Sequence, residues 1–283
     1  MGRKVIVIAG PTGSGKTFVG INLAKMFNTD IISADSRQIY KYFDVGTAKP
    51  TKDELSEIKH HFIDYLEPEE DYNVSRYEKE VLFKIDELYN VGKIPIIVGG
   101  SGLYIKAVTD GIFDDVPTDE GLRKRFKDTI ENYGAEQLLE QLKIVDPISA
   151  EKLLPQNRKR IMRALEVFYL TGKTIGEWQK EHSRTVDLDF EIYGLNWDRE
   201  TLYKMIEERV DKMINDGLVE EVKSLLAKGY NRDYNSFNTV GYKEVLEFID
   251  NFISLERAVE LIKRNTRRYA KRQMTWFNAD KRI

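Results

Sequence analysis

The sequence lacks cysteine altogether and contains only three histidines. The absence of cysteine excludes disulfides, a thiolate nucleophile and cysteine zinc sites, and it leaves His60, His61 and His182 as the only imidazoles. No apolar run approaches the ~18 residues that a membrane span requires, and the start lacks the small-residue cleavage site of a signal peptide. We therefore expect a cytoplasmic protein that does not enter a membrane, and any metal ion should arrive with a substrate.

Positive charge is also in short supply overall. Lysine and arginine total 44 residues against 47 aspartates and glutamates, which gives a net charge of −3. The whole protein is therefore not attracted to polyanions, and a nucleic-acid site would have to be a local basic patch. The composition, 41% hydrophobic and 32% charged, is typical of a globular protein of one or two domains.

The first hundred residues alternate two kinds of pattern. Short β-branched runs occupy residues 5–9, 31–34 and 94–98, and helical patterns occupy residues 16–27 and 76–89. Such alternation predicts an α/β fold in which helices flank a parallel sheet.

The second half of the chain is mostly helical in pattern. Polar helical segments, broken at Gly134, Pro147 and Pro155, fill residues 118–189, which we interpret as a helical insertion. A further strand, at residues 190–195, should return the chain to the sheet. The expected domains are thus a core of residues 1–117 and 190–283 and an insertion of residues 118–189. After the strand the pattern predicts three helices, at residues 201–216, 219–228 and 255–276.

A phosphate-binding loop follows the first strand. The segment GPTGSGKT matches G-x-x-x-x-G-K-[ST] and lies between a strand and a helical pattern, as a P-loop NTPase-like fold requires. Glycines allow the backbone amides and the helix N-terminus to surround phosphate oxygens, while the lysine adds charge and the threonine hydroxyl can bind Mg²⁺. The predicted diphosphate-binding residues are Gly10, Pro11, Thr12, Gly13, Ser14, Gly15, Lys16 and Thr17.

The loop alone does not identify its ligand. The later strand runs into Gly99 and Gly100, without the Asp that commonly ends a Walker-B strand. The segment TKDE at residues 51–54 misses the base-reading motif of GTPases in both sequence and context. A GTPase is therefore excluded, whereas a small-molecule or nucleotide kinase stays open.

Asp35 follows the second strand, at the carboxyl edge of the sheet where ligands bind in doubly wound folds. A carboxylate beside the phosphate loop could act as a general base or orient a nucleophile. The alternative is an aspartate that only caps its turn.

A basic segment lies near the C-terminus. Residues 263–273, KRNTRRYAKRQ, hold six cations and no acid. On a helix, Arg264, Arg268 and Arg272 share one face, and we expect the opposite face to be buried; it comprises Leu255, Val259, Ile262, Thr266, Tyr269, Gln273 and Trp276. RNA contact is favoured over a merely solvated face because no acid interrupts the run.

Several motifs, taken in order, resemble the tRNA dimethylallyltransferase (tRNA isopentenyltransferase) family. They are GPTGSGKT, SADSRQIYK, GTAKP, HHFIDYLEP, IIVGGSGLYI, RALEVFYLTGKT, GYKEV and AKRQMTWF, and they span nearly the whole chain. The resemblance implies that the loop binds dimethylallyl diphosphate with Mg²⁺. It also implies that the prenyl group is transferred to N6 of adenosine 37 in the anticodon stem-loop of tRNA, releasing pyrophosphate.

The resemblance also implies roles for single residues. Asp35 would accept or orient the amine hydrogen, Lys16 and Arg209 would stabilise the diphosphate, and Ser101 would act on the adenosine side. Arg209 shares a helix face with Met205 and Met213, and the alternative for it is an ion pair with a nearby glutamate on a solvated helix. His60 and His61 are adjacent and point in different directions, so we expect structural roles for both, and we expect Tyr104 to pack.

The tRNA contacts implied by the family pattern are spread along the chain. Beside the phosphate loop they are Asp35, Ser36, Arg37, Gln38 and Ser101. In the insertion they are Arg123, Lys159, Arg160, Ile161, Met162 and Arg163. Later they are Asn238, Thr239, Val240, Gly241, Tyr242, Lys243, Lys271, Arg272 and Gln273. The expected state is a monomer. An RNA-binding protein without prenyl transfer, or a prenyltransferase acting on a free nucleotide, is the other alternative to the kinase.

Overall fold

The computed structural model describes residues 2–111, 116–181 and 187–283, and His182 lies outside them. The chain forms two compact units, of which unit 1 comprises Met1–Thr109 with Asp187–Ile283 and unit 2 comprises Asp110–Val186. The insertion was expected at residues 118–189. Unit 2 begins eight residues earlier than that and ends three residues earlier. The strand pattern explains the second difference, since β5 already begins at Leu188.

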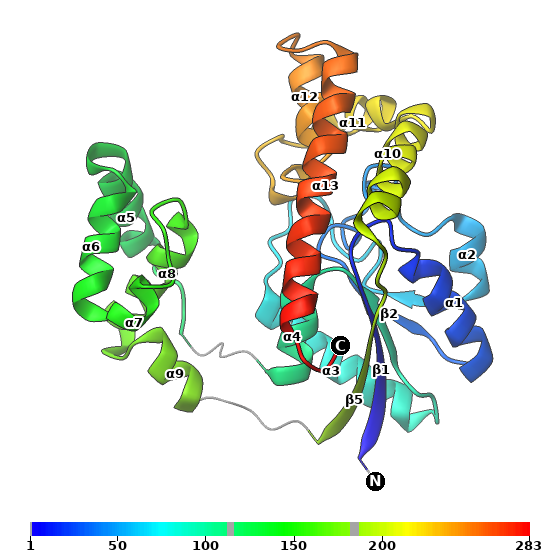
Figure 1. Cartoon of the computed structure of the whole chain (residues 1–283), viewed down its shortest axis with the longest axis horizontal. Coiled ribbons are helices and arrows are strands. Elements are labelled where there is room, and N and C mark those ends of the chain that lie inside the picture. The colour runs from blue at the N-terminus through cyan, green and yellow to red at the C-terminus, as the bar shows by residue number, and fades with distance from the viewer. Residues whose placement is uncertain (1, 112–115, 182–186) are drawn as a thin grey trace. The chain divides into compact units, whose positions relative to one another are not determined.

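A parallel five-stranded sheet forms the centre of unit 1 (Figure 1). Its strands are β1 (Arg3–Ala9), β2 (Ile31–Ala34), β3 (His60–His61), β4 (Ile96–Gly99) and β5 (Leu188–Gly194), in the order β3-β2-β4-β1-β5. The α/β fold is thus confirmed, while β3 was not predicted because two histidines carry no strand signal. The carboxyl ends of β1, β2 and β4 lie together, since Gly99 of β4 is paired with both Ala9 and Ala34.

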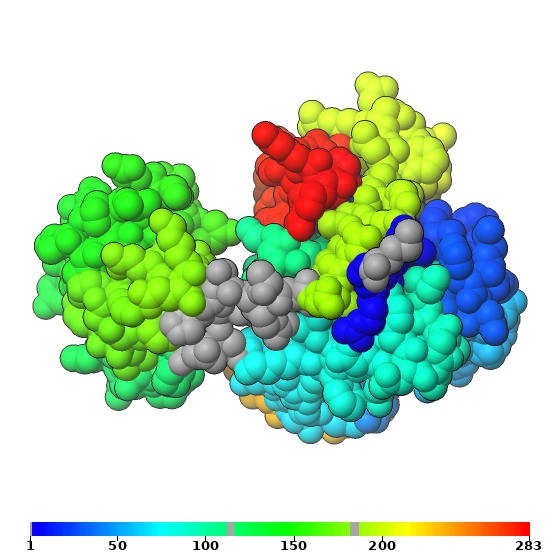
Figure 2. All heavy atoms as spheres, turned by 90° about the horizontal axis from the view of Figure 1, so that it is seen from below, coloured from blue at the N-terminus to red at the C-terminus, as the bar shows by residue number. Residues whose placement is uncertain are grey.

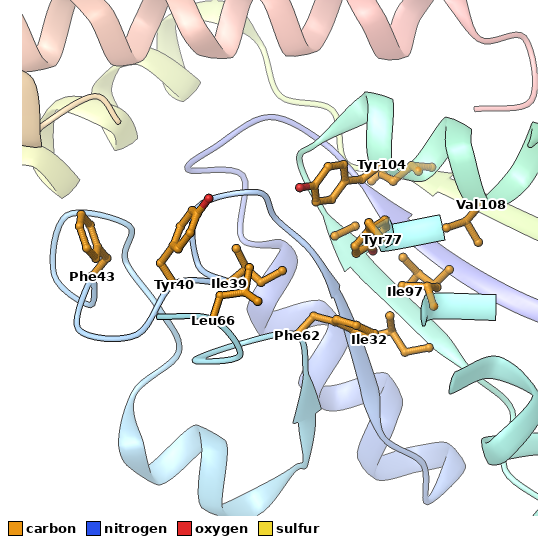
Figure 3. Close-up of a cluster of buried hydrophobic side chains, with 14 of the residues drawn as sticks. Ile32, Ile39, Tyr40, Phe43, Phe62, Leu66, Tyr77, Ile97, Tyr104 and Val108 are labelled. Atoms are coloured by element: carbon orange, nitrogen blue, oxygen red, sulfur yellow. The ribbon is translucent and has the colours of Figure 1, made fainter. Parts of the chain in front are cut away.

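Helices cover both faces of this sheet, because the strands carry apolar side chains on both faces. The unit 1 helices are α1 (Lys16–Phe27), α2 (Lys52–Glu57), α3 (Val74–Asn90), α4 (Gly102–Asp110), α10 (Arg199–Asn215), α11 (Leu218–Ala227), α12 (Tyr242–Ile249) and α13 (Leu255–Ala279). Ile21 of α1 packs with Ile8 on one face, and Val81 of α3 and Val108 of α4 pack with Ile97 on the other. Figure 3 shows the second cluster, in which Tyr77 and Tyr104 come together. Their rings stack with centroids 4.1 Å apart.

Two expectations about the C-terminal part were wrong. The last strand is followed by α10, α11, α12 and α13, and the short helix α12 was missed because it spans only eight residues behind Gly241, whose φ is 100°. Trp276 was expected on the buried face of α13 but is 40% exposed, because the core contact in this last turn is made by Phe277. The other end of the expected face behaves similarly, since Leu255 is only partly buried.

Unit 2 is entirely helical in its described part. Its helices are α5 (Glu120–Tyr133), α6 (Ala135–Val145), α7 (Pro147–Ala150), α8 (Arg158–Thr171) and α9 (Ile175–Glu181). Gly134, at φ 85°, separates α5 from α6, and Pro147 is the first residue of α7 behind the capping side chain of Asp146. Leu138, Leu142 and Leu165 belong to a separate hydrophobic core. The green spheres of Figure 2 belong mostly to this unit.

Candidate active site

The phosphate loop connects β1 to α1 at the carboxyl edge of the sheet. Gly13 and Gly15 have φ values of 81° and 83°, which other residues rarely adopt, and Gly15 caps α1 without a side-chain hydrogen bond. Among the described residues, no acceptor bonds to the backbone amides of Gly13, Gly15, Lys16 or Thr17. These free amides, together with the helix N-terminus, form a cradle for an anion.

The amide of Thr12 does not belong to this cradle, although Thr12 was among the predicted diphosphate-binding residues. It donates to Oε1 of Gln273 at 2.8 Å. The amide of Ser14 is also engaged, with the carbonyl of Pro11 at 3.3 Å. By contrast, the buried Oγ of Ser14 has no partner among the described residues, and Ser14 lines the cavity at the loop. A polar ligand would therefore satisfy groups that the protein itself leaves unpaired.

Lys16 points back along the loop, where its Nζ donates to the carbonyl of Pro11 at 2.6 Å. The pKa of Lys16 is lowered to about 7. Burial is the main cause, the nearby Arg209 guanidinium adds to it, and Asp35 opposes the shift by less than Arg209 contributes. Two cations that repel each other without a ligand are well placed to receive an anion, which would restore the proton on Lys16.

Two cavities meet beside the loop. The first, of about 550 Å³, is lined by the phosphate loop, and the second, of about 410 Å³, is lined by Arg37, Asn238 and Lys243 among others. The residues that line both are Thr12, Asp35, Thr47, Arg209 and Tyr269. A ligand held by the loop can therefore meet a second ligand at this shared wall.

Asp35 stands at the shared wall and also shapes its own turn. Its Oδ1 accepts hydrogen bonds from the amides of Arg37 at 2.8 Å and Gln38 at 3.2 Å. Its Oδ2 has no hydrogen bond from a described residue. Turn capping and a role toward a ligand are thus compatible, because they use different oxygens.

Arg209 reaches the same wall from α10. Burial lowers its pKa, Asp35 opposes that shift, and its Nη2 donates to the carbonyl of Thr47 at 3.4 Å. No carboxylate of the described residues lies within the 4.0 Å of an ion pair, so the alternative of an ordinary surface pair with glutamate is wrong. The guanidinium is left for an anionic ligand.

Glu221, which the sequence analysis did not single out, holds the segment of residues 44–46, whose Gly46 lines the second cavity. Its carboxylate accepts from the amides of Asp44, Val45 and Gly46 at 2.9, 2.8 and 3.2 Å and from the Tyr242 hydroxyl at 2.5 Å. A Cβ on Gly46 would lie 2.4 Å from the Tyr242 ring, so only glycine fits. The motifs GTAKP and GYKEV therefore meet through Glu221, and no spacing rule would have revealed it.

The segment of residues 44–46 leads directly into Thr47. The Thr47 carbonyl accepts a hydrogen bond from Arg209 and another, at 3.1 Å, from Nε2 of Gln38. Gln38 also donates to the Ala48 carbonyl at 3.0 Å. Ser101 is held similarly, since its Oγ accepts from the amide of Ser36 at 3.0 Å. The site residues from β2 and β4 are thus positioned by hydrogen bonds to one another.

Trp197 is a further loop contact that sequence reasoning missed. Its Nε1 donates to the carbonyl of Ser14 at 3.1 Å. The residue follows β5, at the same edge of the sheet as the phosphate loop, and that position was the signal that could have found it.

The six cations of residues 263–273, all on the basic helix α13, are used in two ways. Lys263 pairs with Asp211 at 2.6 Å and Arg267 pairs with Glu207, both on α10. The remaining four are exposed and form no ion pair with a described residue; they are Arg264, Arg268, Lys271 and Arg272. Arg272 also lines the second cavity.

The basic cluster of unit 2 forms the first turns of α8. Lys159 and Arg160 are exposed, whereas Ile161 is fully buried and does not reach a ligand, and Met162 packs, partly buried, against the unit 2 core. Arg163 pairs with Glu166 at 2.6 Å and donates to the carbonyl of Val116 at 2.9 Å.

Arg123 of α5 also pairs with Glu166, at 2.9 Å. Burial alone would raise the pKa of the Glu166 carboxyl, but the hydrogen bonds from Arg123 and Arg163 lower it below its usual range.

The connection before α12 provides the remaining expected contacts. Asn238, Val240 and Lys243 line the second cavity, as does the largely buried Thr239. Tyr242 is fully buried and its hydroxyl donates to Glu221, so its side chain is part of the protein interior and does not reach an RNA surface. Gln273 is 7% exposed with both amide atoms bonded inside the protein.

The histidines of β3 have structural roles. His61 bonds through Nε2 to Asp30 at 2.9 Å, and Nδ1 of His60 bonds to the carbonyl of Ile58 at 2.8 Å. Over the described residues no group of three or more His, Cys, Asp or Glu side chains is arranged to hold a metal ion. Nor is any of the described helices both long and apolar enough to span a membrane.

The fold and site define a P-loop α/β protein with an anion cradle and a second cavity beside it. A family model described as IPP transferase matches residues 38–280. The chain belongs to this family.

Individual relatives agree with the family model over nearly the whole chain. The tRNA dimethylallyltransferase of Thermoanaerobacter sp. (strain X514) is 47% identical over 281 residues, which are 98% of this chain and 89% of the relative. The solved tRNA isopentenylpyrophosphate transferase of Bacillus halodurans is 37% identical with a TM-score of 0.72, covering 99% of this chain and 88% of that one. A eukaryotic dimethylallyltransferase acting on tRNA is 31% identical with a TM-score of 0.81, covering 97% and 70%.

Proposed function

We propose that the protein transfers a dimethylallyl group from dimethylallyl diphosphate to N6 of an adenosine in tRNA, releasing pyrophosphate. The observation that carries the proposal is the shared wall: an anion cradle and a second cavity meet at Asp35 and Arg209. The names of the relatives supply the substrates, and the geometry supplies a place where donor and acceptor can meet.

The diphosphate would lie on the free amides of the phosphate loop, with Lys16 and Arg209 beside it. As N6 attacks the allylic carbon, the bond from that carbon to the diphosphate oxygen breaks, and negative charge grows on the leaving pyrophosphate. Amides, a lysine and an arginine fixed before the reaction stabilise this charge more than they stabilise the bound donor.

Asp35 would accept the hydrogen that N6 loses. Its Oδ2 is the oxygen that the turn does not use, and the Oδ1 bonds to Arg37 and Gln38 keep the carboxylate in place. A base held in this way needs no reorganisation when the amine arrives.

Mg²⁺ would bind at Thr17, at the start of α1. The Thr17 side chain lines the first cavity and its hydroxyl has no hydrogen bond to a described residue, which fits a metal ligand. With no cluster of carboxylates among the described residues, the other ligands would be donor oxygens and water. The ion would add positive charge at the leaving pyrophosphate.

The acceptor would enter through the second cavity, whose walls carry Arg37, Lys243 and Arg272. Its adenine must leave the base stack to reach Asp35, and Ser36 and Ser101 lie beside that position. We assign the exposed cations of α13 and the exposed Lys159 and Arg160 to the phosphates of the anticodon stem-loop. A monomeric state and a cytoplasmic location stay predictions from the sequence.

Labelled dimethylallyl diphosphate and Mg²⁺, offered with tRNA or with AMP, test the proposal. We expect label in tRNA alone; label only in AMP, or in neither, would contradict it and reopen the kinase and RNA-binding alternatives.

Single-turnover assays should place the chemistry. Asp35→Ala and Arg209→Ala are each expected to slow prenylation by about 10²-fold or more, as for loss of a general base or of a fixed charge. Lys204→Ala is the matched control, because Lys204 lies on α10 with its side chain 80% exposed. Wild-type rates in both site variants would refute the roles given to Asp35 and Arg209.

A further inference from the structure

Gln273 lies within the basic helix but directs its side chain into the protein. Its Oε1 accepts from the amide of Thr12 at 2.8 Å and its Nε2 donates to the carbonyl of Gly100 at 2.8 Å. The residue is 7% exposed, while its neighbours Lys271 and Arg272 are exposed. One buried amide thus connects α13, the phosphate loop and the turn after β4.

The bond to Thr12 has a consequence for Lys16. The peptide group between Pro11 and Thr12 is planar, so holding the Thr12 N–H also fixes the direction of the Pro11 carbonyl. That carbonyl accepts from Nζ of Lys16 at 2.6 Å and from the amide of Ser14 at 3.3 Å. Gln273 therefore controls a peptide on which both the lysine and the turn of the loop depend.

The bond to Gly100 anchors the other end of the amide. A Cβ on Gly100 would lie 2.4 Å from Nε2 of Gln273 and 3.3 Å from the carbonyl of Gly10. The absence of a side chain at Gly100 is therefore what admits the glutamine. Thr12, which the glutamine holds, belongs to the wall that both cavities share.

We propose that Gln273 is a positioning residue of the donor site, which orients the Pro11–Thr12 peptide of the phosphate loop, and that it is not an RNA contact. This inference rests on the proposed function, because it takes the loop to hold a diphosphate. Loss of Gln273 leaves a buried N–H and a buried carbonyl unpaired, so the loop relaxes to satisfy them and Lys16 loses its fixed acceptor.

The variant Gln273→Met tests the proposal, because it keeps the side-chain volume and removes both hydrogen bonds. Inorganic pyrophosphate with Mg²⁺ is titrated by calorimetry, and tRNA binding and steady-state kinetics are measured on the same preparations. We expect pyrophosphate to bind at least ~5-fold more weakly and the KM for dimethylallyl diphosphate to rise in parallel. The affinity for tRNA should stay within about twofold of wild type, because a buried side chain contributes no phosphate contact.

Two variants on the same helix act as opposite controls. Lys271→Ala removes an exposed cation and should weaken tRNA binding without changing pyrophosphate binding. Thr275→Ala should change neither, because the exposed Thr275 hydroxyl donates to the Lys271 carbonyl within the helix, at 2.9 Å.

Gly100→Ala is a second, independent route to the same effect, since its methyl group displaces the Gln273 amide without altering Gln273 itself. It should reproduce the loss of pyrophosphate affinity, and it keeps the inference testable if Gln273→Met does not fold. Folded variants of both kinds that bind pyrophosphate like wild type would overturn the inference. So would a Gln273→Met protein that loses tRNA affinity alone. A wild-type protein that binds no pyrophosphate would instead contradict the diphosphate site of the proposed function.

Discussion

The two basic clusters of the chain, on α13 and at the start of α8, look alike in sequence but differ in structure. Of the six cations at residues 263–273 of α13, two pair with carboxylates of α10 and four stay exposed. In unit 2, Arg163 and the more distant Arg123 both bond to Glu166, whose side chain is 1% exposed. A cation in such a run therefore need not face RNA, because the buried Glu166 takes up Arg163 while Lys159 and Arg160 of the same cluster stay exposed.

The difference has an energetic reason. Glu166 is buried and must be compensated, so the two arginines are held in place whatever lies outside the protein. The exposed cations of α13 lose little by exchanging water for a phosphate. Arg123 and Arg163 should therefore control folding, and the exposed cations of α13 should control RNA affinity. The following changes test this difference.

The largest effect is expected from Glu166→Gln. Two partly buried guanidinium groups lose their charged partner, and unit 2 should lose about 3 kcal/mol of stability. Denaturant unfolding followed by tryptophan fluorescence, to which Trp178 on α9 of unit 2 contributes, measures this. The control is Glu120→Gln, since Glu120 lies 3.8 Å from Arg123 but is 83% exposed, and it should change stability by less than about 0.5 kcal/mol. Equal effects of the two variants would show that burial of Glu166 is not the cause.

The double variant Arg268→Ala with Arg272→Ala should lower tRNA affinity about tenfold and reduce the slope of log K against log salt by about 1.5. Filter binding at several salt concentrations measures both quantities. Lys263→Ala is the matched control, because Asp211 already neutralises Lys263 at 2.6 Å, and its slope should stay close to that of wild type. A larger loss in the control would reverse the assignment of the two helix faces.

Lys16 differs from both clusters because its charge depends on pH. With its pKa lowered to about 7 by burial and by Arg209, it is protonated below pH 7 and loses its charge above it. Pyrophosphate affinity should therefore fall by up to about tenfold per pH unit above 7, until the ligand itself restores the proton. The variant Lys16→Met provides the baseline, since it retains only the titration of pyrophosphate. Parallel pH profiles would contradict a lowered pKa.

The same shift makes a prediction for stability. Between about pH 7 and the ordinary lysine value of 10.5, the unfolded chain binds a proton on Lys16 that the folded chain has lost. The contribution of Lys16 to stability therefore rises with pH over this window, and Lys16→Met should flatten that rise. Denaturant unfolding at pH 7 and pH 9 measures it.

The smallest effect separates residues within unit 2. Arg160→Ala should lower tRNA affinity about twofold without destabilising the protein, because Arg160 is exposed. Arg123→Ala should do the reverse, leaving the salt slope of binding unchanged while unit 2 becomes less stable. If both variants act only on RNA affinity, Arg123 exchanges Glu166 for RNA, and the contrast between the clusters disappears.

Local sequence signals predicted most of unit 1. The residue pattern placed α1 at Lys16–Phe27 and β2 at Ile31–Ala34 without error, because a phosphate loop and apolar strands carry strong local information. Elements without such information were missed: β3 is two histidines long, and α12 spans only eight residues. Their existence depends on neighbours that are distant in the chain.

The candidate site divides in the same way. Asp35 and Lys16 were identified from motifs, and the structure places both at the first cavity. The roles of Glu221, Trp197 and Gln273 were not, because each acts by a hydrogen bond to a backbone group more than 170 residues away.

The sequence by itself determined that the chain forms an α/β fold with a phosphate-loop backbone, because glycines, lysine and threonine at fixed spacing impose that backbone. Tertiary structure alone decided which loop amides and which arginines remain free for a ligand. The amide of Thr12 is withdrawn by Gln273, and two arginines are withdrawn by Glu166. In both cases the reason is the same: a buried polar group must find a partner, and only the folded chain determines which partner is within reach.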